Sequence, residues 1–113
     1  MNITDGRNQS VPLFADDVEI QALSGDFDPY ASGSGTTSDK AKYLNHGFLV
    51  RPDTDGAIKV VTWANYKANG DTVVDANGVI LTGCVTSKWE EVKVVKVFET
   101  GSDSTNVMIG IIL

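Results

Sequence analysis

A chain of 113 residues, of which 42% are apolar, has room for one small domain with its own core. The formal net charge of -6 argues against a nucleic-acid partner, because clustered Lys and Arg drive binding to a phosphate backbone. Cys84 is the single cysteine, which excludes an intrachain disulfide and a thiolate metal cluster. No segment approaches the ~20 apolar residues of a membrane helix. We therefore expect no nucleic acid, no membrane and no cofactor as partner.

The first 42 residues are predicted to form an extended, mostly irregular N-terminal arm. Residues 1–40 hold seven acidic and two basic side chains, and residues 31–38 form a Gly/Ser-rich tether. Such a segment buries too little apolar surface to offset the entropy of ordering it. Two parts follow, an acidic arm at 1–42 and a β body at 43–113. The body is expected to stay folded in a chain that lacks residues 2–38.

Two short apolar islands interrupt the arm, and each is too small to form a core alone. One interpretation is that they dock on a neighbouring subunit and gain order on contact. The other is that the first island adds an edge strand to the same domain. The candidate docking residues are Val11, Leu13, Phe14, Val18 and Ile20 in the first island and Phe27 and Tyr30 in the second.

From residue 43 onward, apolar side chains recur with a period of two, which is typical of β-strands. Residues 48–50 and 57–64 are predicted to form a hairpin, because Pro52 and the Asp55-Gly56 pair lie between them. Two further Asn-Gly turns, at 69–70 and 77–78, bracket residues 72–75 and precede a strand at 79–82.

The last part of the chain predicts two strands, at 92–99 and 107–113, joined by a polar turn. Both faces of the first strand are largely apolar, so it is expected to be central in the sheet or to lie at a subunit contact. The segments together predict an all-β fold, a small antiparallel β-sandwich or barrel of five to seven strands.

A metal site is not predicted. Asp53, Asp55 and Gly56 carry part of a calcium-loop pattern, but the Glu expected at loop position twelve is missing. The preferred interpretation is a hairpin whose Asp side chains cap their own backbone.

Catalysis is not predicted either. His46 and Cys84 lie in no recognisable nucleophile motif. The adjacent Glu90 and Glu91 would face opposite sides of a strand. A candidate aromatic surface for sugar comprises Trp63, Tyr66 and Trp89, although packing in the core or at an interface is the preferred interpretation.

Four segments of the body occur in a fixed order along the chain and alternate between turn residues and apolar strand residues. They are DGAIKV at 55–60, GDTV at 70–73, VVKVF at 94–98 and TGSDSTNV at 100–107. This order resembles that of the small head-spike base proteins of tailed phages and gene-transfer particles. The resemblance spans residues 48–113, and the chain departs from the family at 102–103 and in a longer stretch at 77–91.

The resemblance implies a non-enzymatic virion protein associated with the phage head, in a decoration, auxiliary capsid or vertex spike-base role. Such a protein would bind capsid protein through its arm and anchor or stabilise its neighbours through its β body. Its partners would be further copies of itself, in a homo-oligomer, and other virion proteins of the capsid or fibre. Two alternatives stay open, a carbohydrate-binding β-sandwich module and a neck or tail accessory protein.

Overall fold

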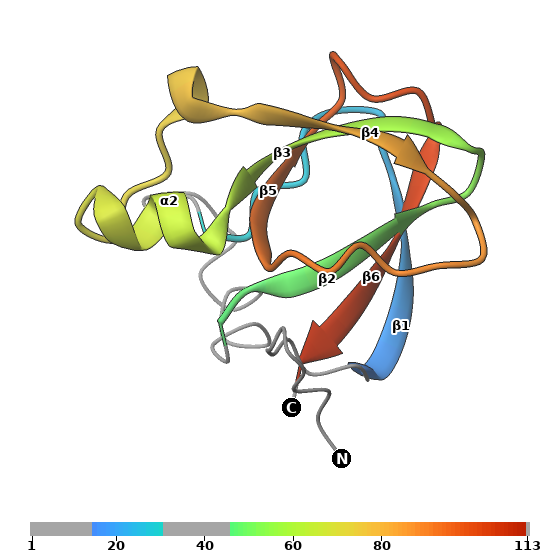
Figure 1. Ribbon diagram of the computed structural model, residues 1–113, viewed down its shortest axis with the longest axis horizontal. Coiled ribbons are helices and arrows are strands. Elements are labelled where there is room, and N and C mark those ends of the chain that lie inside the picture. Colours follow the sequence, from blue (N-terminus) through green and yellow to red (C-terminus); the bar gives the residue numbers. More distant parts are fainter. Residues whose placement is uncertain (1–14, 31–45, 113) are drawn as a thin grey trace.

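The computed structural model describes residues 15–30 and 46–112, which form one curved sheet of six antiparallel strands (Figure 1). The strand order is β1-β6-β2-β5-β3-β4. The predicted all-β class is confirmed. None of the helices in these two ranges is long and apolar enough to cross a membrane. The elements are β1 (Ala15–Ala22), β2 (Phe48–Pro52), β3 (Gly56–Thr62), α2 (Trp63–Ala68), the 3-10 helix η2 (Asp75–Asn77), β4 (Val79–Cys84), β5 (Val94–Phe98) and β6 (Asn106–Ile112).

The predicted hairpin between β2 and β3 is wrong, although both strands and the turn between them are present. β5 lies between the two strands, and its residue Val97 pairs with Val60 of β3. β2 pairs on its other side with β6, where Val50 lies opposite Ile109. A local turn signal therefore marked the change of direction correctly but did not identify the strand that pairs with β2.

On the side away from β3, β5 has two different neighbours along its length. Phe48 of β2 lies opposite Val94, the first residue of β5, and this is the one residue pair that the two antiparallel strands share. The space beside β5 is taken by Phe27, which exchanges backbone hydrogen bonds of 2.8 and 2.9 Å with Val97. The segment that follows β1 thus ties one edge of the sheet back to its centre.

All five residues of β5 are buried, which confirms the prediction that this strand is central. Val94, Val95 and Val97 are fully buried. Burying an aliphatic side chain of this size contributes roughly 1.5–3 kcal/mol. The same core includes Phe48, Val50, Ile58, Val60, Val61, Tyr66, Val107 and Ile109.

Residues 15–30 belong to the sheet and its core, and not to an arm. β1 pairs along β6, with Ile20 opposite Met108, and Leu23 donates a hydrogen bond to the Thr105 carbonyl at 2.8 Å. For residues 15–22 the edge-strand interpretation is therefore confirmed. The predicted tether at 31–38 and the boundary at residue 42 lie outside the described residues.

The strand predicted for residues 57–64 ends two residues early, because Thr62 starts a helix. Its Oγ1 accepts a hydrogen bond from the Asn65 backbone N–H at 3.2 Å, which caps the first turn of α2. Residues 72–75 form no strand in the structure. Val73 packs against the core instead, and η2 leads into β4.

Candidate functional site

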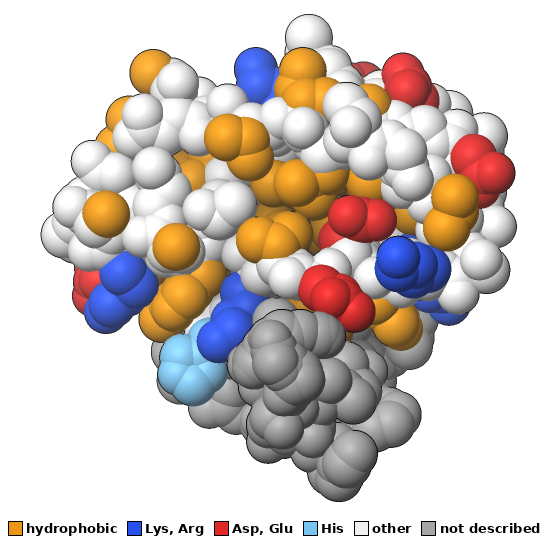
Figure 2. Space-filling view, in the orientation of Figure 1, with side chains coloured by type: hydrophobic (Ala, Val, Ile, Leu, Met, Phe, Trp, Pro, Cys, Tyr) orange, Lys and Arg blue, Asp and Glu red, His pale blue; other side chains and the backbone are white. Residues whose placement is uncertain are grey.

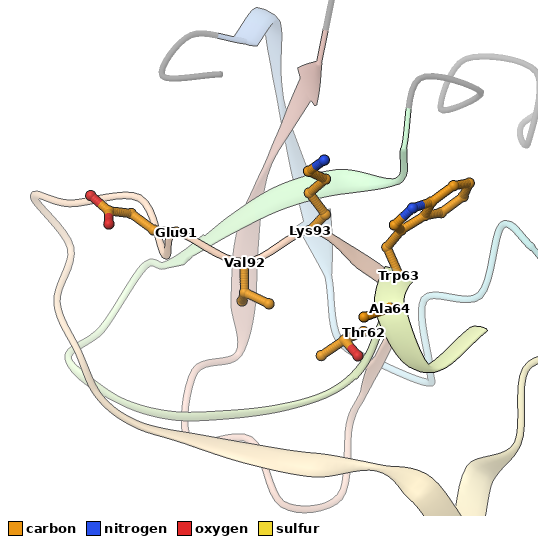
Figure 3. A pocket seen from close by; sticks show the side chains of 6 residues that line it. All are labelled: Thr62, Trp63, Ala64, Glu91, Val92 and Lys93. Atoms are coloured by element: carbon orange, nitrogen blue, oxygen red, sulfur yellow. The ribbon is translucent and has the colours of Figure 1, made fainter. Parts of the chain in front are cut away.

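An open pocket of about 330 Å³ lies where β3 ends and the chain approaches β5 (Figure 3). The backbone N–H of Trp63 donates to the Lys93 carbonyl at 2.9 Å and joins the two walls. In Figure 3 the side chains of Lys93 and Trp63 extend to one side and that of Val92 to the other. The lining residues are Thr62, Trp63, Ala64, Glu91, Val92 and Lys93.

Neighbouring side chains surround the Trp63 ring. Tyr66 and His46 lie with their ring centroids 5.5 Å from that of Trp63, and Lys67 Nζ lies 5.4 Å from the Trp63 centroid. Tyr30 adds an edge-to-face contact with Tyr66 at 5.1 Å, and burial raises the pKa of Tyr30 to about 12. The cluster is therefore a packing unit that holds α2 against the sheet.

The three predicted aromatic residues do not form a shared exposed surface. Tyr66 is buried, with 3% of its surface exposed. Trp89 lies apart, under the Arg51 guanidinium at 4.9 Å, and Arg51 also donates to the Thr86 carbonyl at 2.7 Å. Trp63 alone borders the pocket.

Among the predicted docking residues whose side chains the structure describes, which are Ile20, Phe27 and Tyr30, Ile20 is the exposed one, with 69% of its surface accessible on β1. Tyr30 is wrong as a docking residue, because it is 5% exposed in the core. Phe27 is partly buried and packs edge-on against Phe48 at 5.3 Å. Val18 lies opposite Gly110 in the β1–β6 ladder. Val11, Leu13 and Phe14 lie outside the described residues.

The Asp residues of the 53–56 turn cap the backbone of other segments and not their own. Asn106 donates to Asp53 from its backbone N–H at 3.4 Å and from its side chain at 2.9 Å, and the Thr86 N–H donates to Asp55 at 2.9 Å. From the opposite direction, Asp103 accepts a hydrogen bond from the Ala57 N–H at 2.8 Å. Among the described residues no group of three or more His, Cys, Asp or Glu is placed to hold a metal ion. The carboxylates thus connect the β2–β3 turn to the segment before β6.

Replacing Asp53 by Asn is expected to destabilise the protein by about 1 kcal/mol at neutral pH, since hydrogen bonds to the charged carboxylate are lost. The side-chain hydrogen bond from Asn106 lowers the pKa of Asp53 below its ordinary value of 3.8. The stabilisation of the fold by the Asp53 carboxylate is therefore complete above pH 3.8, and it is lost as the pH falls through the lowered pKa. Urea unfolding of both proteins across this range measures the difference, and a constant difference would contradict the assignment.

Cys84 and His46 occupy structural positions. The Cys84 thiol is buried and donates to the Leu81 carbonyl at 3.3 Å. Burial, followed by the charge of Glu90, raises its pKa to about 11, so it is a thiol at neutral pH and a poor nucleophile. His46 packs edge-on against Trp63 at the sharp entry to β2. There Gly47 has a φ of +82°, and a Cβ on it would lie 2.5 Å from the Val94 carbonyl oxygen.

A buried lysine surrounded by three carboxylates is a feature that the sequence analysis did not find. Lys96 of β5 has a side chain only 7% exposed, and its Nζ lies 2.8 Å from Asp75, 3.5 Å from Asp26 and 3.6 Å from Asp28. Burial alone would lower the pKa of Lys96, but these carboxylates outweigh it and raise the pKa. Burial also raises the pKa of Asp28, against the opposing effect of Lys96. The sequence signal that could have indicated this site is Lys96 itself, the one charged residue in the valine-rich strand β5.

The β4 edge of the sheet is apolar and exposed. Val79 and Ile80 have 45% and 55% of their surfaces accessible. Figure 2 shows hydrophobic side chains gathered in a hollow at the centre of this face, below β4, with acidic and basic groups around them. Apolar surface of this kind is typical of a contact site between proteins.

Comparison with family models, with characterised proteins and with solved structures found no match. Of the surfaces described, the β4 edge, the Trp63 pocket and the exposed Ile20 on β1 are the ones that a partner could reach.

Proposed function

We propose that the chain is a non-enzymatic structural subunit of a tailed-phage virion, associated with the head in a decoration, auxiliary capsid or vertex spike-base role. The observation that carries the proposal is the exposed apolar edge at Val79 and Ile80 on a chain with a net charge of -6. An exposed apolar strand at a sheet edge favours association with other proteins. The segment order that resembles head-spike base proteins supplies the class of particle.

The use of the reactive side chains supports an assembly role. The Asp53, Asp55 and Asp103 carboxylates accept hydrogen bonds that hold loops together. Cys84 is protonated and buried at neutral pH, and Lys96 is held among carboxylates. These groups stabilise a rigid β body, which is what a particle subunit requires.

The proposed partners are other virion proteins, of the capsid or fibre, and further copies of the chain. Ile20 offers an exposed apolar contact on β1, immediately after the segment that contains Val11, Leu13 and Phe14. We assign the capsid contact to this end of the chain. The contact with neighbouring copies then falls to the opposite edge of the sheet, at β4.

The alternative of a carbohydrate-binding module is less well supported by the geometry. Sugar binding by stacking needs exposed ring faces. Tyr66 is buried, and the Trp63 ring has Lys67, His46 and Tyr66 around it. A neck or tail position remains an alternative location for the same structural role.

The proposal predicts that the chain is a stoichiometric component of phage or gene-transfer particles made by cells that carry its gene. Particles purified on a density gradient should contain the chain by mass spectrometry, at a constant ratio to the major capsid protein. A chain with residues 2–14 deleted should be folded but reduced in the particle fraction, because β1 is kept and the part of the proposed capsid contact at Val11, Leu13 and Phe14 is removed. Recovery of the intact chain only in particle-free fractions would contradict the proposal. Labelling of intact particles then separates head from neck or tail.

A further inference from the structure

The two edges of the sheet differ in charge. β1 contains Asp16, Asp17 and Glu19 and has a register shift between Ala15 and Val18. Charges and bulges on an edge strand discourage pairing with another chain. β4, with the sequence VILTGC, has no charged residue. The sheet is therefore protected against strand addition at one edge and not at the other.

β4 has the chemistry needed to accept another strand. Among the described strands it pairs with β3 alone, so every second residue directs its backbone N–H and C=O away from the sheet. Its exposed side chains are Val79, Ile80 and Thr82, and Leu81 is half-buried. A strand added here would satisfy the outward backbone groups and cover these side chains together.

We propose that β4 pairs with β4 of a second copy of this chain, antiparallel and about a two-fold axis, so that two sheets join into one. This β4 contact rests on the proposed function, because it would be the contact through which copies of the virion subunit associate with each other. It is a contact of the purified chain, which is testable without particles.

The sequence of β4 is self-complementary in one register. When Ile80 lies opposite Ile80 of the partner subunit, Val79 lies opposite the partner's Leu81, and the reverse holds across the axis. Ile80 shares the outer face with Lys59, whereas Val79 and Leu81 share the inner face with the buried Val60 and Ile58. Apolar side chains therefore meet apolar side chains on both faces, as stable cross-strand pairs require.

Charge identifies a second β4 as the occupant. Pairing of β4 with the β1 strand of another copy would bring three carboxylates to an apolar strand, where desolvation opposes binding. Two copies of charge -6 also repel each other, so their contact should lie on an uncharged strip. Among the described strands, β4 combines an exposed edge with the absence of charge.

Sedimentation equilibrium of the full chain tests the proposal. The natural sequence is expected to be dimeric, and Ile80→Lys is expected to be monomeric with an unchanged circular dichroism spectrum. Ile20→Lys is the matched control, because it places the same charge at an exposed Ile of the opposite edge and should leave the dimer intact. A monomeric natural chain, a dimeric Ile80→Lys variant, or loss of the dimer in Ile20→Lys would overturn the proposal.

Cysteine substitution tests the register. Directly opposite residues have Cβ atoms about 4.5–5.5 Å apart, close enough for a disulfide after a small adjustment. Ile80→Cys should form a covalent dimer with itself on oxidation, whereas Val79→Cys should do so only when mixed with Leu81→Cys. Ile20→Cys should stay monomeric on denaturing gels, as should the natural chain, whose Cys84 is buried. Failure of Ile80→Cys to cross-link would overturn the register.

These outcomes are separate from those of the virion proposal. A chain that is monomeric in solution but present in particles refutes the β4 contact and leaves the virion role standing. A chain that is dimeric through β4 but absent from particles refutes the virion role and leaves the β4 contact standing.

Discussion

A chain that lacks residues 2–38 is expected to lose its cooperative fold. The deletion removes three structural features: the edge strand β1, which pairs with β6; the Phe27–Val97 bridge beside β5; and the buried Tyr30. Truncating a single buried aromatic residue to Ala costs about 3–5 kcal/mol, and a small domain has only about 5–15 kcal/mol of stability. Circular dichroism and urea unfolding should show an unfolded or aggregated chain. The expectation from sequence, that the body survives this deletion, is reversed by the position of β1.

Two milder variants make this result interpretable. Deletion of residues 2–14 keeps β1 and should retain the unfolding midpoint of the full chain within experimental error. Tyr30→Ala should lower the free energy of unfolding by about 3 kcal/mol through loss of its contacts with Trp63 and Tyr66. A cooperative transition at the normal midpoint in the chain without residues 2–38 would show that β1 and Tyr30 contribute little.

Replacing Lys96 by Ala is expected to destabilise the protein by about 2–3 kcal/mol. The change leaves Asp26, Asp28 and Asp75 together without their shared cation, and removing one partner of a buried ion pair costs about 3–5 kcal/mol. The lower figure applies here because Asp26 and Asp75 are well exposed, with 41% and 65% of their side chains accessible. The free energy of unfolding in urea measures the loss.

Lys59→Ala is the matched control for Lys96. Both ammonium groups lie over the Phe98 ring, at 4.9 Å for Lys59 and 4.7 Å for Lys96, but the three carboxylates surround Lys96. Lys59→Ala should therefore cost less than about 1 kcal/mol. Equal losses in the two variants would show that the ring contact matters and the carboxylates do not.

The cost of Lys96→Ala should also shrink in acid. Burial raises the pKa of Asp28 above 3.8, so its carboxylate form destabilises the fold above that pKa, and protonation relieves this as the pH falls through it. Without Lys96, which lowers the pKa of Asp28, the relief should begin at a higher pH. A difference between variant and natural chain that is independent of pH would contradict this account.

The strand segments of the body were largely predictable from the sequence, and their partners were not. The alternation in residues 48–50 and 79–82, and the apolar faces of 92–99, correspond to β2, β4 and β5. The Pro and Asp-Gly signals between β2 and β3 also mark a real turn. Pairing failed as a prediction because β5, distant in sequence, occupies the position beside β3 that a local hairpin would have given to β2.

For the candidate site residues, too, the residue type could be read from the sequence and the contact partner could not. Phe27 and Tyr30 were expected at a partner surface because the polar segment around them indicated an arm. In the structure Phe27 pairs with Val97 of β5, and Tyr30 packs against Trp63. Asp53 and Asp55 were expected to cap their own turn, yet they reach Asn106 and Thr86. In each case the residue type was informative, and the partner came from a segment far along the chain.

The amino-acid sequence by itself determined that this is a small all-β protein with a central valine-rich strand, because side-chain alternation and turn residues act over a few positions. It also determined where charge lies along the chain, with three acids in residues 15–22 and none in residues 79–84, although the structure was needed to show that these two segments are the edge strands. Only the tertiary structure decided that residues 15–30 complete the sheet, that β5 separates β2 from β3, and that Lys96 is buried among carboxylates. Those features depend on which distant segments bury each other's apolar surface and satisfy each other's hydrogen bonds, and no local pattern encodes that choice.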